Sequence, residues 1–382
     1  KKTSSIMQAV SILGIISYKV WPAQVGGQKC AAGFYEYLSK QCDVTVLVSR
    51  ENQQKDIPLK HAESFLFNHW WGPLNLIWLP SMLLLIKKRK ITHIIIEHSY
   101  LGWLGWLLSK LSGRPLIIRS HNIESQRLRD RADVWWGLYA WYERWVLRHV
   151  AHNFFVTEED MHWAIAKWKI KADKASIASF GITQQQPPSG DEKHGCRKFL
   201  ETAHDIAPEE KVFLFNGTLD YLPNVDAIRI IISELVPRLS KYQNFQYCIL
   251  ICGNRLSEPW QRVLEEYDNV VYAGFVDDID IYYEGADCFI VPSSLGTGIK
   301  TKLIEALANN QMIISTHNGI KGLKTEHYLH KLIAVPDYDW DAFAEAMVNL
   351  PERSLLKTPE AFFQTFHWER ITQQALMQLQ KI

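Results

Sequence analysis

The sequence has few cysteines, no excess charge of either sign and no long hydrophobic run. Six cysteines are scattered along 382 residues, without a Cys-x-x-Cys pair or a Cys/His quartet at zinc-ligand spacing. This pattern argues against a disulfide scaffold or a zinc module, and it fits the reducing cytoplasm. Lys and Arg number 42 against 41 Asp and Glu. Because such a chain has no overall positive field, we expect no nucleic acid among its partners.

The longest nearly apolar run, residues 74–86, is interrupted by Asn75, Pro80 and Ser81. A membrane-spanning helix needs about 20 apolar residues, so this run predicts a buried or interfacial segment. The apolar fraction of 47% and the charged fraction of 22% are ordinary for a globular protein. The length suits two domains better than one.

The first half alternates short, β-branched apolar runs with helical patterns. The predicted strands are residues 12–17, 44–49, 93–97, 116–120 and 153–156. Nearly continuous apolar strands separated by helices indicate a parallel sheet that is covered on both faces. We therefore predict a doubly wound α/β domain over residues 1–185.

A polar, proline-containing stretch at residues 184–190 predicts an interdomain linker, and the same pattern begins again after it. The second set of predicted strands is residues 212–215, 247–252, 270–272, 288–291 and 312–315. We predict a second doubly wound domain over residues 186–360 and one long helix over the tail, residues 361–382. Ligands of open α/β sheets bind beyond the carboxyl ends of the strands, so two such domains predict a cleft between those ends.

The strongest local pattern lies at residues 291–306, where a strand ends, two glycines follow and a helix begins. Lys300 and Lys302 fall in the first turn of that helix, and Glu305 lies further along it. The unpaired N–H groups of a helix N-terminus, together with two lysines, predict a site for a phosphate group. The alternative is a glycine-rich turn with a solvated basic helix start, which the helix dipole disfavours.

This segment, Gly-x-Gly-x-Lys-x-Lys-Leu-x-Glu-Ala, resembles the donor-binding segment of retaining GT-B glycosyltransferases of the group-1, family-4 type. Three further motifs follow the family's order and spacing and extend the resemblance over nearly the whole chain. They are residues 216–227 at the opening of the second domain, 274–278 at the nucleobase loop and 366–369 at the start of the crossover helix. The resemblance implies the α/β GT-B fold, in which two Rossmann-like domains face a central cleft.

The resemblance also implies the residues of the site. His121, directly after a first-domain strand, would contact the transferred sugar, and Glu124 suits either this edge or the first turn of a helix. Glu305 would contact the nucleotide ribose, while Lys300 and Lys302 would steady the diphosphate. We therefore predict His121, Lys300 and Glu305 as catalytic residues. The predicted donor-binding residues are Gly26, Gly27, Gly217, Thr218, Phe275, Val276, Thr297, Gly298, Ile299 and Lys302.

Two positions depart from the family pattern. No Lys or Arg lies between Gly217 and Arg229, where the family often has a phosphate-binding cation, and Thr297 stands where a glutamate is common. The resemblance implies same-face attack with retention, in which the leaving phosphate oxygen takes the acceptor proton. The adjacent Asp277 and Asp278 suit a loop or a helix start rather than a metal-binding Asp-x-Asp pair. Since a helix dipole and lysines can stabilise a leaving diphosphate, we expect no metal and no cofactor besides the donor.

Aromatic residues are concentrated in the first domain, where 12 of the 15 tryptophans precede residue 170. Trp70, Trp71 and Trp78 come before a basic run at residues 87–90. This arrangement is typical either of a core helix with a basic last turn or of a segment that lies in a membrane interface. The aromatic residues at 135–145 predict either a buried helix or an acceptor groove.

From these observations we predict a cytoplasmic, retaining, metal-independent glycosyltransferase. It would move a sugar from a nucleotide-diphosphate sugar to a glycan or lipid-linked acceptor, with peripheral contact at the inner face of the membrane. Two alternatives stay open. A GT-B sugar-nucleotide epimerase would need carboxylates and a second histidine deep in the cleft, and a non-catalytic glycosyltransferase-like binding protein is suggested by the missing cation and by Thr297.

Overall fold

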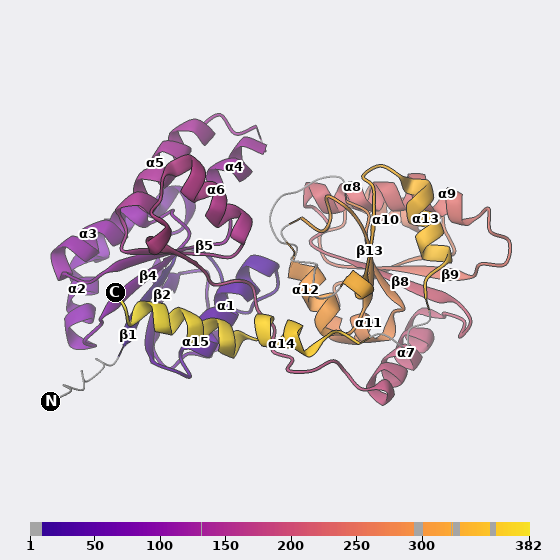
Figure 1. Ribbon diagram of the computed structural model, residues 1–382, viewed down its shortest axis with the longest axis horizontal. Coiled ribbons are helices and arrows are strands. Elements are labelled where there is room, and N and C mark those ends of the chain that lie inside the picture. Colours follow the sequence, from indigo (N-terminus) through magenta and orange to yellow (C-terminus); the bar gives the residue numbers. More distant parts are fainter. Residues whose placement is uncertain (1–9, 131, 294–300, 322, 324–328, 352–356) are drawn as a thin grey trace. The chain divides into compact units, whose positions relative to one another are not determined.

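The computed structural model describes residues 10–130, 132–293, 301–321, 323, 329–351 and 357–382 (Figure 1). The chain forms two compact units. Unit 1 contains the residues up to Gly181 together with Phe366–Ile382, and unit 2 is Ile182–Thr365. No helix in the described ranges combines the length and the apolar content that crossing a bilayer requires.

Unit 1 is built on a sheet of seven parallel strands in the order β3-β2-β1-β4-β5-β6-β7 (Figure 1). The strands are β1 (Ser11–Ile16), β2 (Asp43–Ser49), β3 (Ala62–Leu66), β4 (His93–Glu97), β5 (Leu116–Ser120), β6 (His152–Phe155) and β7 (Ala175–Ile177). The chain runs outward from β1 through β2 to β3 and then returns to the other side of β1. The strand order therefore reverses between β1 and β4, which is where doubly wound sheets bind ligands.

Helices cover both faces of this sheet. They are α1 (Gly26–Leu38), α2 (Leu79–Lys88), α3 (Gly102–Ser112), α4 (Glu124–Asp130), α5 (Trp136–His149), α6 (Glu158–Trp168) and α15 (Trp368–Leu379), with short helical segments η1 (Gln54–Asp56), η2 (His69–Trp78) and η3 (Ala172–Lys174). The helices α2, α3, α5 and α6 share one hydrophobic core with Leu13 and Ile15 of β1. Between these two residues lies Gly14, where a Cβ would meet the ring of Tyr35 in α1. Because neighbouring residues of a strand point to opposite faces, α1 lies on the other side of the sheet.

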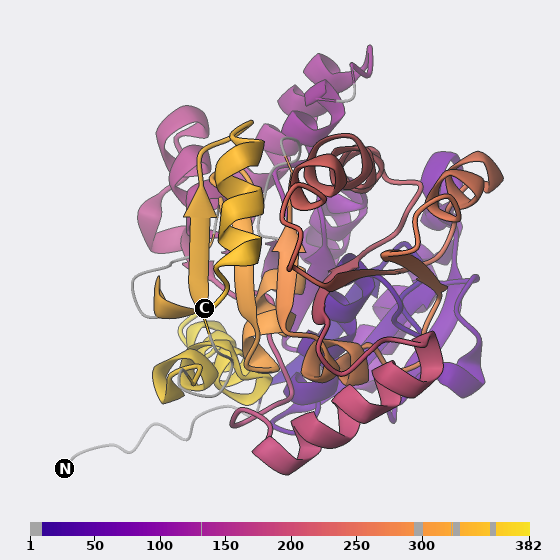
Figure 2. The same cartoon turned by 90° about the vertical axis from the view of Figure 1, so that its right-hand side faces the viewer.

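Unit 2 has a second parallel sheet, in the order β10-β9-β8-β11-β12-β13 (Figure 2). Its strands are β8 (Lys211–Asn216), β9 (Tyr247–Cys252), β10 (Val270–Gly274), β11 (Cys288–Val291), β12 (Met312–Thr316) and β13 (Leu332–Val335). Its helices are α7 (Gly190–His204), α8 (Leu222–Ile230), η4 (Ile231–Leu235), α9 (Val236–Leu239), α10 (Glu258–Leu264), α11 (Ile279–Gly285), α12 (Thr301–Ala308), α13 (Trp340–Val348) and α14 (Glu360–Phe366), with a short turn at η5 (Leu329–Lys331). The order reverses between β8 and β11. The prediction of two Rossmann-like α/β domains is confirmed.

The edge strands β3, β7 and β13 were not predicted. Two further elements also differ from the prediction. The predicted linker ends in a helix, α7, because Ser189 and Glu192 form a reciprocal cap: the Ser189 hydroxyl accepts from the Glu192 N–H at 3.3 Å and the Glu192 carboxylate accepts from the Ser189 N–H at 2.7 Å. The tail is two helices rather than one, because His367 has an extended backbone with φ −70° and ψ 130°. This break lies next to the unit boundary, so α14 up to Thr365 belongs to unit 2 and α15 belongs to unit 1.

Trp368, the first residue of α15, fastens the end of the chain to unit 1. Its buried indole lies 5.9 Å from the ring of Phe180. A Cβ at Gly33 in α1, or at Gly181, would collide with this indole. The two glycines therefore form the slot that the tryptophan fills.

We predict that Gly33→Ala lowers the free energy of unfolding by about 1–3 kcal/mol, because the added methyl overpacks the Trp368 slot. Gly27→Ala in the same helix is the matched control, since a Cβ at Gly27 meets no atom within 4 Å. It should leave stability unchanged or raise it by about 0.5 kcal/mol. Urea denaturation followed by tryptophan fluorescence checks both variants. Equal stability of the two would contradict the packing argument.

Candidate functional site

Three polar side chains meet at the carboxyl ends of β4 and β5. Glu97 is the last residue of β4, Arg119 lies in β5 and His121 follows β5. Oε2 of Glu97 accepts a hydrogen bond from Nη1 of Arg119 at 3.1 Å and lies 2.5 Å from Nε2 of His121. Nη1 of Arg119 is also 3.0 Å from that imidazole nitrogen. All three side chains are buried, so these contacts replace water as their partners.

The protonation states of this cluster follow from its burial and its charges. Burial alone would raise the pKa of Glu97, but Arg119 and the hydrogen bond from His121 hold that pKa at about 2. Burial and repulsion from His98 lower the pKa of His121 to about 4. At neutral pH the cluster is therefore a carboxylate, a guanidinium and a neutral imidazole. A hydrogen bond to the carboxylate requires a proton on Nε2, so the approach of Arg119 Nη1 to Nε2 is then not a hydrogen bond and Nδ1 of His121 is the acceptor.

Arg119 ties this cluster to other elements of unit 1. Its Nη2 lies 3.1 Å from Sγ of Cys30 in α1 and 3.4 Å from the carbonyl oxygen of Ala178. Its guanidinium stacks 4.3 Å from the ring centroid of Phe34. One buried cation thus connects β4, α1 and the segment after β7 around the base of His121.

The N-terminus of α1 adds backbone donors to the same edge of the sheet. Helix α1 begins with Gly26 and Gly27, and Val25 before them offers no side-chain acceptor for their N–H groups. A Cβ built at Gly27 meets no atom within 4 Å, so the space beside this residue is open. The structure therefore places Gly26 and Gly27 at the start of the helix whose Cys30 contacts Arg119, at the sheet edge that holds His121.

A second group of polar side chains packs around His121. His98, in the loop after β4, has a left-handed backbone with φ 59°, and its ring lies 4.3 Å from that of His121. Its Nδ1 is 3.2 Å from Oε1 of Glu124. Oε2 of Glu124 accepts from the Tyr100 hydroxyl at 2.7 Å and pairs with Arg127 at 2.7 Å. Burial would raise the pKa of Glu124, but His98 and Arg127 hold it at about 2.

Glu143 of α5 caps the helix that Glu124 begins. Its two carboxylate oxygens accept from the N–H groups of Glu124 and Ser125 at 3.0 and 2.9 Å. The Ser99 hydroxyl donates to the same carboxylate at 3.3 Å. Burial nevertheless raises the pKa of Glu143 to about 7. This buried acid therefore supports the loops that carry His98 and Glu124.

The pKa of Glu143 predicts how stability depends on pH. The folded state keeps the proton up to about pH 7, whereas the unfolded chain loses it near its ordinary value of about 4.3. Stability therefore falls as pH rises through this window. Between pH 5 and 8 the wild type should lose about 2 kcal/mol more than Glu143→Gln, as measured by urea denaturation at each pH. Glu159→Gln, which removes an exposed carboxylate of α6, should behave like the wild type, and parallel curves for all three proteins would refute the assignment.

In unit 2, Lys302 of α12 reaches the end of the first strand. Its Nζ donates to the carbonyl oxygen of Asn216 at 2.6 Å and to Oδ1 of Asn224 at 3.0 Å. The ammonium also lies 4.9 Å from the ring centroid of Phe215. Asn216 is the last residue of β8, so Lys302 brings a positive charge to the turn that starts at Gly217.

The turn at Gly217 is packed closely against its neighbours. Asn224 donates to the carbonyl oxygen of Thr218 at 2.8 Å. Gly253, after β9, has φ 149°, and a Cβ there would overlap the Gly217 carbonyl. The N–H of Gly253 donates to the carbonyl oxygen of Gly274 at 2.8 Å. The N–H of Gly217 donates to the carbonyl oxygen of Cys252 at 3.1 Å, so these contacts fix the turn and the direction of the following Thr218 amide.

Glu305 lies half-buried in α12 near a buried tyrosine. Tyr283 accepts from Nδ2 of Asn216 at 2.9 Å and donates to the carbonyl oxygen of Lys302 at 3.2 Å. Burial and the negative charge of Glu305 raise the pKa of Tyr283 well above its ordinary value. The structure therefore gathers Lys302, Glu305 and the Gly217 turn at one end of the unit 2 sheet.

For two other predicted site residues, the structure gives only their position and exposure. Phe275 is 53% exposed and Val276 is half-buried, and both follow the end of β10. Four predicted residues lie outside the described part of the chain: Thr297, Gly298, Ile299 and Lys300.

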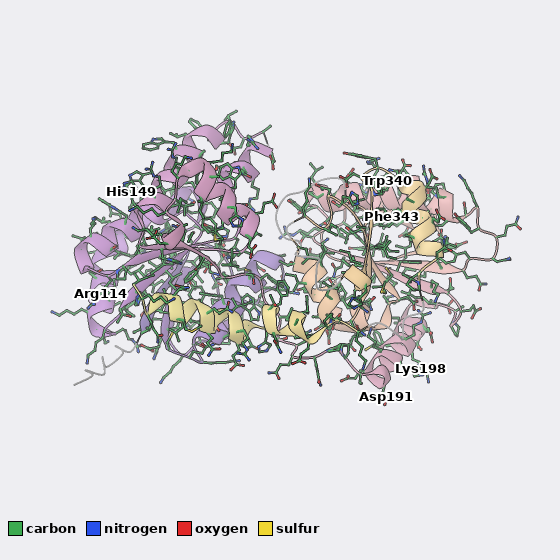
Figure 3. The ribbon with its side chains drawn as sticks, viewed as in Figure 1. Arg114, His149, Asp191, Lys198, Trp340 and Phe343 are labelled. Atoms are coloured by element: carbon green, nitrogen blue, oxygen red, sulfur yellow. The ribbon has the colours of Figure 1, made fainter. Side chains whose placement is uncertain are left out.

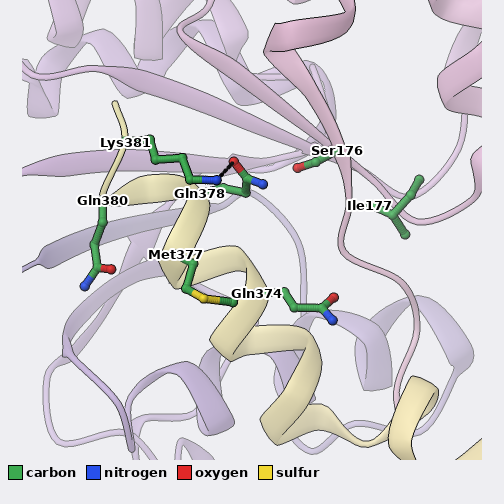
Figure 4. A pocket seen from close by; sticks show the side chains of 7 residues that line it. All are labelled: Ser176, Ile177, Gln374, Met377, Gln378, Gln380 and Lys381. Atoms are coloured by element: carbon green, nitrogen blue, oxygen red, sulfur yellow. Dashed lines mark hydrogen bonds between the residues drawn. The ribbon is translucent and has the colours of Figure 1, made fainter. Parts of the chain in front are cut away.

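Two further features carry no assigned chemistry. Over the described ranges, no three His, Cys, Asp or Glu side chains are grouped so that they could hold a metal ion. A groove of about 540 Å³ lies between α15 and β7 in unit 1 (Figure 4). It is lined by Ser176, Ile177, Gln374, Met377, Gln378, Gln380 and Lys381. These side chains include no carboxylate, histidine or cysteine, so we assign the groove no catalytic role.

Comparison with known families matches both units. Residues 26–185 match the model of Glycosyltransferase Family 4, and residues 210–353 match the model of Glycosyl transferases group 1. Between them the two matches account for most of the chain. The chain belongs to the group 1, family 4 glycosyltransferases.

Solved glycosyltransferases share the GT-B fold of this chain. Sucrose-phosphate synthase from Thermosynechococcus elongatus is 17% identical with a TM-score of 0.73, and the match covers 97% of this chain and 98% of that one. HepE from Anabaena, in complex with UDP and glucose, is 14% identical with a TM-score of 0.71 over 98% and 100% of the two chains. An uncharacterized protein of the cps region of Klebsiella pneumoniae is 27% identical over 143 residues, which is 36% of each chain.

Six residues that contact the predicted site of this glycosyltransferase were not themselves predicted. They are Glu97, His98, Cys30, Glu143, Asn216 and Tyr283. Glu97 and His98 end a strand at the same sheet edge as His121, so their position in the pattern could have indicated them. Nothing local marks Glu143 or Tyr283, whose roles depend on contacts between distant elements.

Proposed function

We propose that the protein is a retaining glycosyltransferase that moves a sugar from a nucleotide-diphosphate sugar to a glycan or lipid-linked acceptor, without a resident metal. The observation that carries this proposal is the buried Glu97–Arg119–His121 cluster. It fixes an imidazole at the ligand-binding edge of unit 1, in a chain of a glycosyltransferase family.

For the donor we propose a uridine-diphosphate sugar. HepE, with the same fold, has been solved with UDP, with UDP-glucose and with UDP and glucose. In unit 2 the Gly217 turn with the Thr218 amide, the Lys302 ammonium and Glu305 lie at one end of the sheet, while the Gly217 N–H itself donates to the carbonyl oxygen of Cys252. Backbone N–H groups and a lysine suit a diphosphate, and a carboxylate suits the ribose hydroxyls.

For unit 1 we propose that His121 contacts the transferred sugar. Its Nε2 is held by Glu97, so Nδ1 is the nitrogen that accepts from a sugar hydroxyl. The amides of Gly26 and Gly27 supply donors for developing negative charge on the phosphate. A neutral imidazole and preorganised amides need no protein nucleophile, which accords with same-face attack and retention.

For the acceptor we propose a glycan or a lipid-linked glycan of the cell surface. WaaG, a glycosyltransferase involved in lipopolysaccharide biosynthesis, shares the fold with a TM-score of 0.62 at 15% identity. The curated relative is encoded in a cps region. Both comparisons favour an acceptor that is assembled for the cell envelope.

The donor proposal predicts saturable binding of UDP in calorimetry, with weaker or no binding of GDP, ADP and dTDP. Glu305→Ala should weaken UDP binding about tenfold or more, because the carboxylate no longer accepts from the ribose. Glu345→Ala, an exposed glutamate of α13 in the same unit, is the matched control and should bind as the wild type does. No binding of any of the four nucleotides would remove the donor assignment and favour a non-catalytic protein.

The role of His121 predicts a kinetic effect. His121→Ala should lower kcat about 100-fold, because a preorganised contact to the reacting sugar is lost, while UDP binding stays near the wild-type value. Transfer is followed by NMR in buffer with EDTA, which also reports the anomeric configuration of the product. An inverted product, or wild-type transfer abolished by EDTA and restored by a divalent metal, would contradict the mechanism proposed above.

A further inference from the structure

Unit 1 exposes large apolar side chains in two segments of one helical layer. In the first segment, η2 and α2, the exposed apolar side chains are those of Trp71, Leu74, Leu76, Ile77 and Leu84. In the second, before and along α5, they are those of Val134, Trp135, Trp136, Leu138 and Trp141. Trp71, Trp135 and Trp141 are 65%, 62% and 67% exposed. Tryptophan is seldom this exposed in a soluble surface, and groups of such residues mark interaction sites. The side chain of Trp70 lies outside the described part of the structure.

The two segments belong to one face of unit 1. Helix α2 packs against α3, and α3 packs against α5, so the three helices form a continuous layer (Figure 1). Trp106 of α3 and Trp145 of α5 are in contact, with ring centroids 5.7 Å apart. The inner sides of all three helices contribute to one hydrophobic core over the sheet. Their outer sides, which carry the exposed residues, therefore share one surface, which we call the α2–α3–α5 face.

This face is also strongly basic. Residues 70–150 contain 12 Lys and Arg but only 5 Asp and Glu, in a chain whose net charge is +1. Three of the five acids, Glu97, Glu124 and Glu143, are buried, and so is one of the twelve bases, Arg119. The basic residues include Lys87, Lys88 and Lys90 at the end of α2, Lys110 in α3, Arg114 after it, and Arg144 and Arg148 in α5. Figure 3 labels Arg114 and His149, which both lie at the left edge of unit 1 in that view.

We infer that the α2–α3–α5 face docks on the surface of an anionic lipid bilayer. Exposed tryptophan and leucine side chains partition into the interface, and lysine and arginine are attracted to negatively charged headgroups. Apolar and basic side chains together on one face favour a lipid surface as the partner. An acidic protein could be bound by the basic residues alone, without several exposed tryptophans. The inference does not depend on the transfer reaction, because none of these side chains is assigned to the site.

The inference predicts binding to vesicles in flotation experiments with the full chain. The wild type should float with vesicles of phosphatidylcholine and phosphatidylglycerol, and it should bind much less to phosphatidylcholine alone. Raising the salt concentration should weaken binding, because surface charges are screened. Vesicles with brominated acyl chains should quench the tryptophan fluorescence of the bound protein, which reports insertion directly.

Two double variants test the two parts of the surface. Trp135→Ser with Trp141→Ser should lower the partition coefficient about tenfold or more and reduce the quenching. Lys87→Glu with Lys88→Glu should lower binding to anionic vesicles by a similar factor without affecting binding to phosphatidylcholine. The matched control is Lys241→Glu with Tyr242→Ser, which changes one exposed lysine and one exposed aromatic residue in unit 2 and should bind as the wild type does.

The outcomes separate this inference from the proposed function. Each variant should retain UDP binding and its circular dichroism spectrum, which shows that lost flotation is not lost folding. Wild-type protein that remains unbound with both vesicle types would overturn the inference, and so would tryptophan variants that bind and are quenched like the wild type. Loss of flotation only in the unit 2 control would assign the surface to the other unit.

Discussion

The contact on which unit 1 depends is the buried ion pair between Arg119 and Glu97. A guanidinium with no exposed surface is stable only when its donors and its charge are satisfied inside the protein. Here the two Nη groups contact one carboxylate, one thiol and one carbonyl oxygen, which come from β4, α1 and the segment after β7, although Nε has no partner among the described residues. The same carboxylate holds His121. This carboxylate therefore determines both the packing of the sheet edge and the orientation of the imidazole.

In unit 2 a lysine is the cation that is held at the end of the sheet. The sequence departs from its family by having no cation between Gly217 and Arg229. The structure brings the ammonium of Lys302 to the same turn from α12, where it is held by the carbonyl oxygen of Asn216. Lys302 belongs to the family motif itself, so it does not replace the cation that is missing after Gly217. The departure therefore keeps its weight as support for a non-catalytic protein.

Sequence patterns predicted the elements whose signals are local, and failed where the signal is distant. The strand at residues 93–97 was predicted with the bounds it has, because a buried parallel strand is a continuous apolar run. The break at His367 was missed, since helical periodicity continues across one extended residue. His121 could be predicted from its place after a strand and from the family resemblance. Glu97 could be indicated by its place at the end of a strand, but its contact with His121 depends on β4 and β5 being neighbours, which only the sheet order provides.

Helix α5 connects the exposed face of unit 1 to its buried site. Its inner side carries Glu143, which caps α4 and thereby supports Glu124 and, through it, His98 beside His121. Its outer side carries exposed tryptophan residues, including Trp141, two positions before Glu143. A rigid helix cannot shift on one side without shifting on the other. Contact of the outer side with a lipid surface would therefore bear directly on the loops that surround His121.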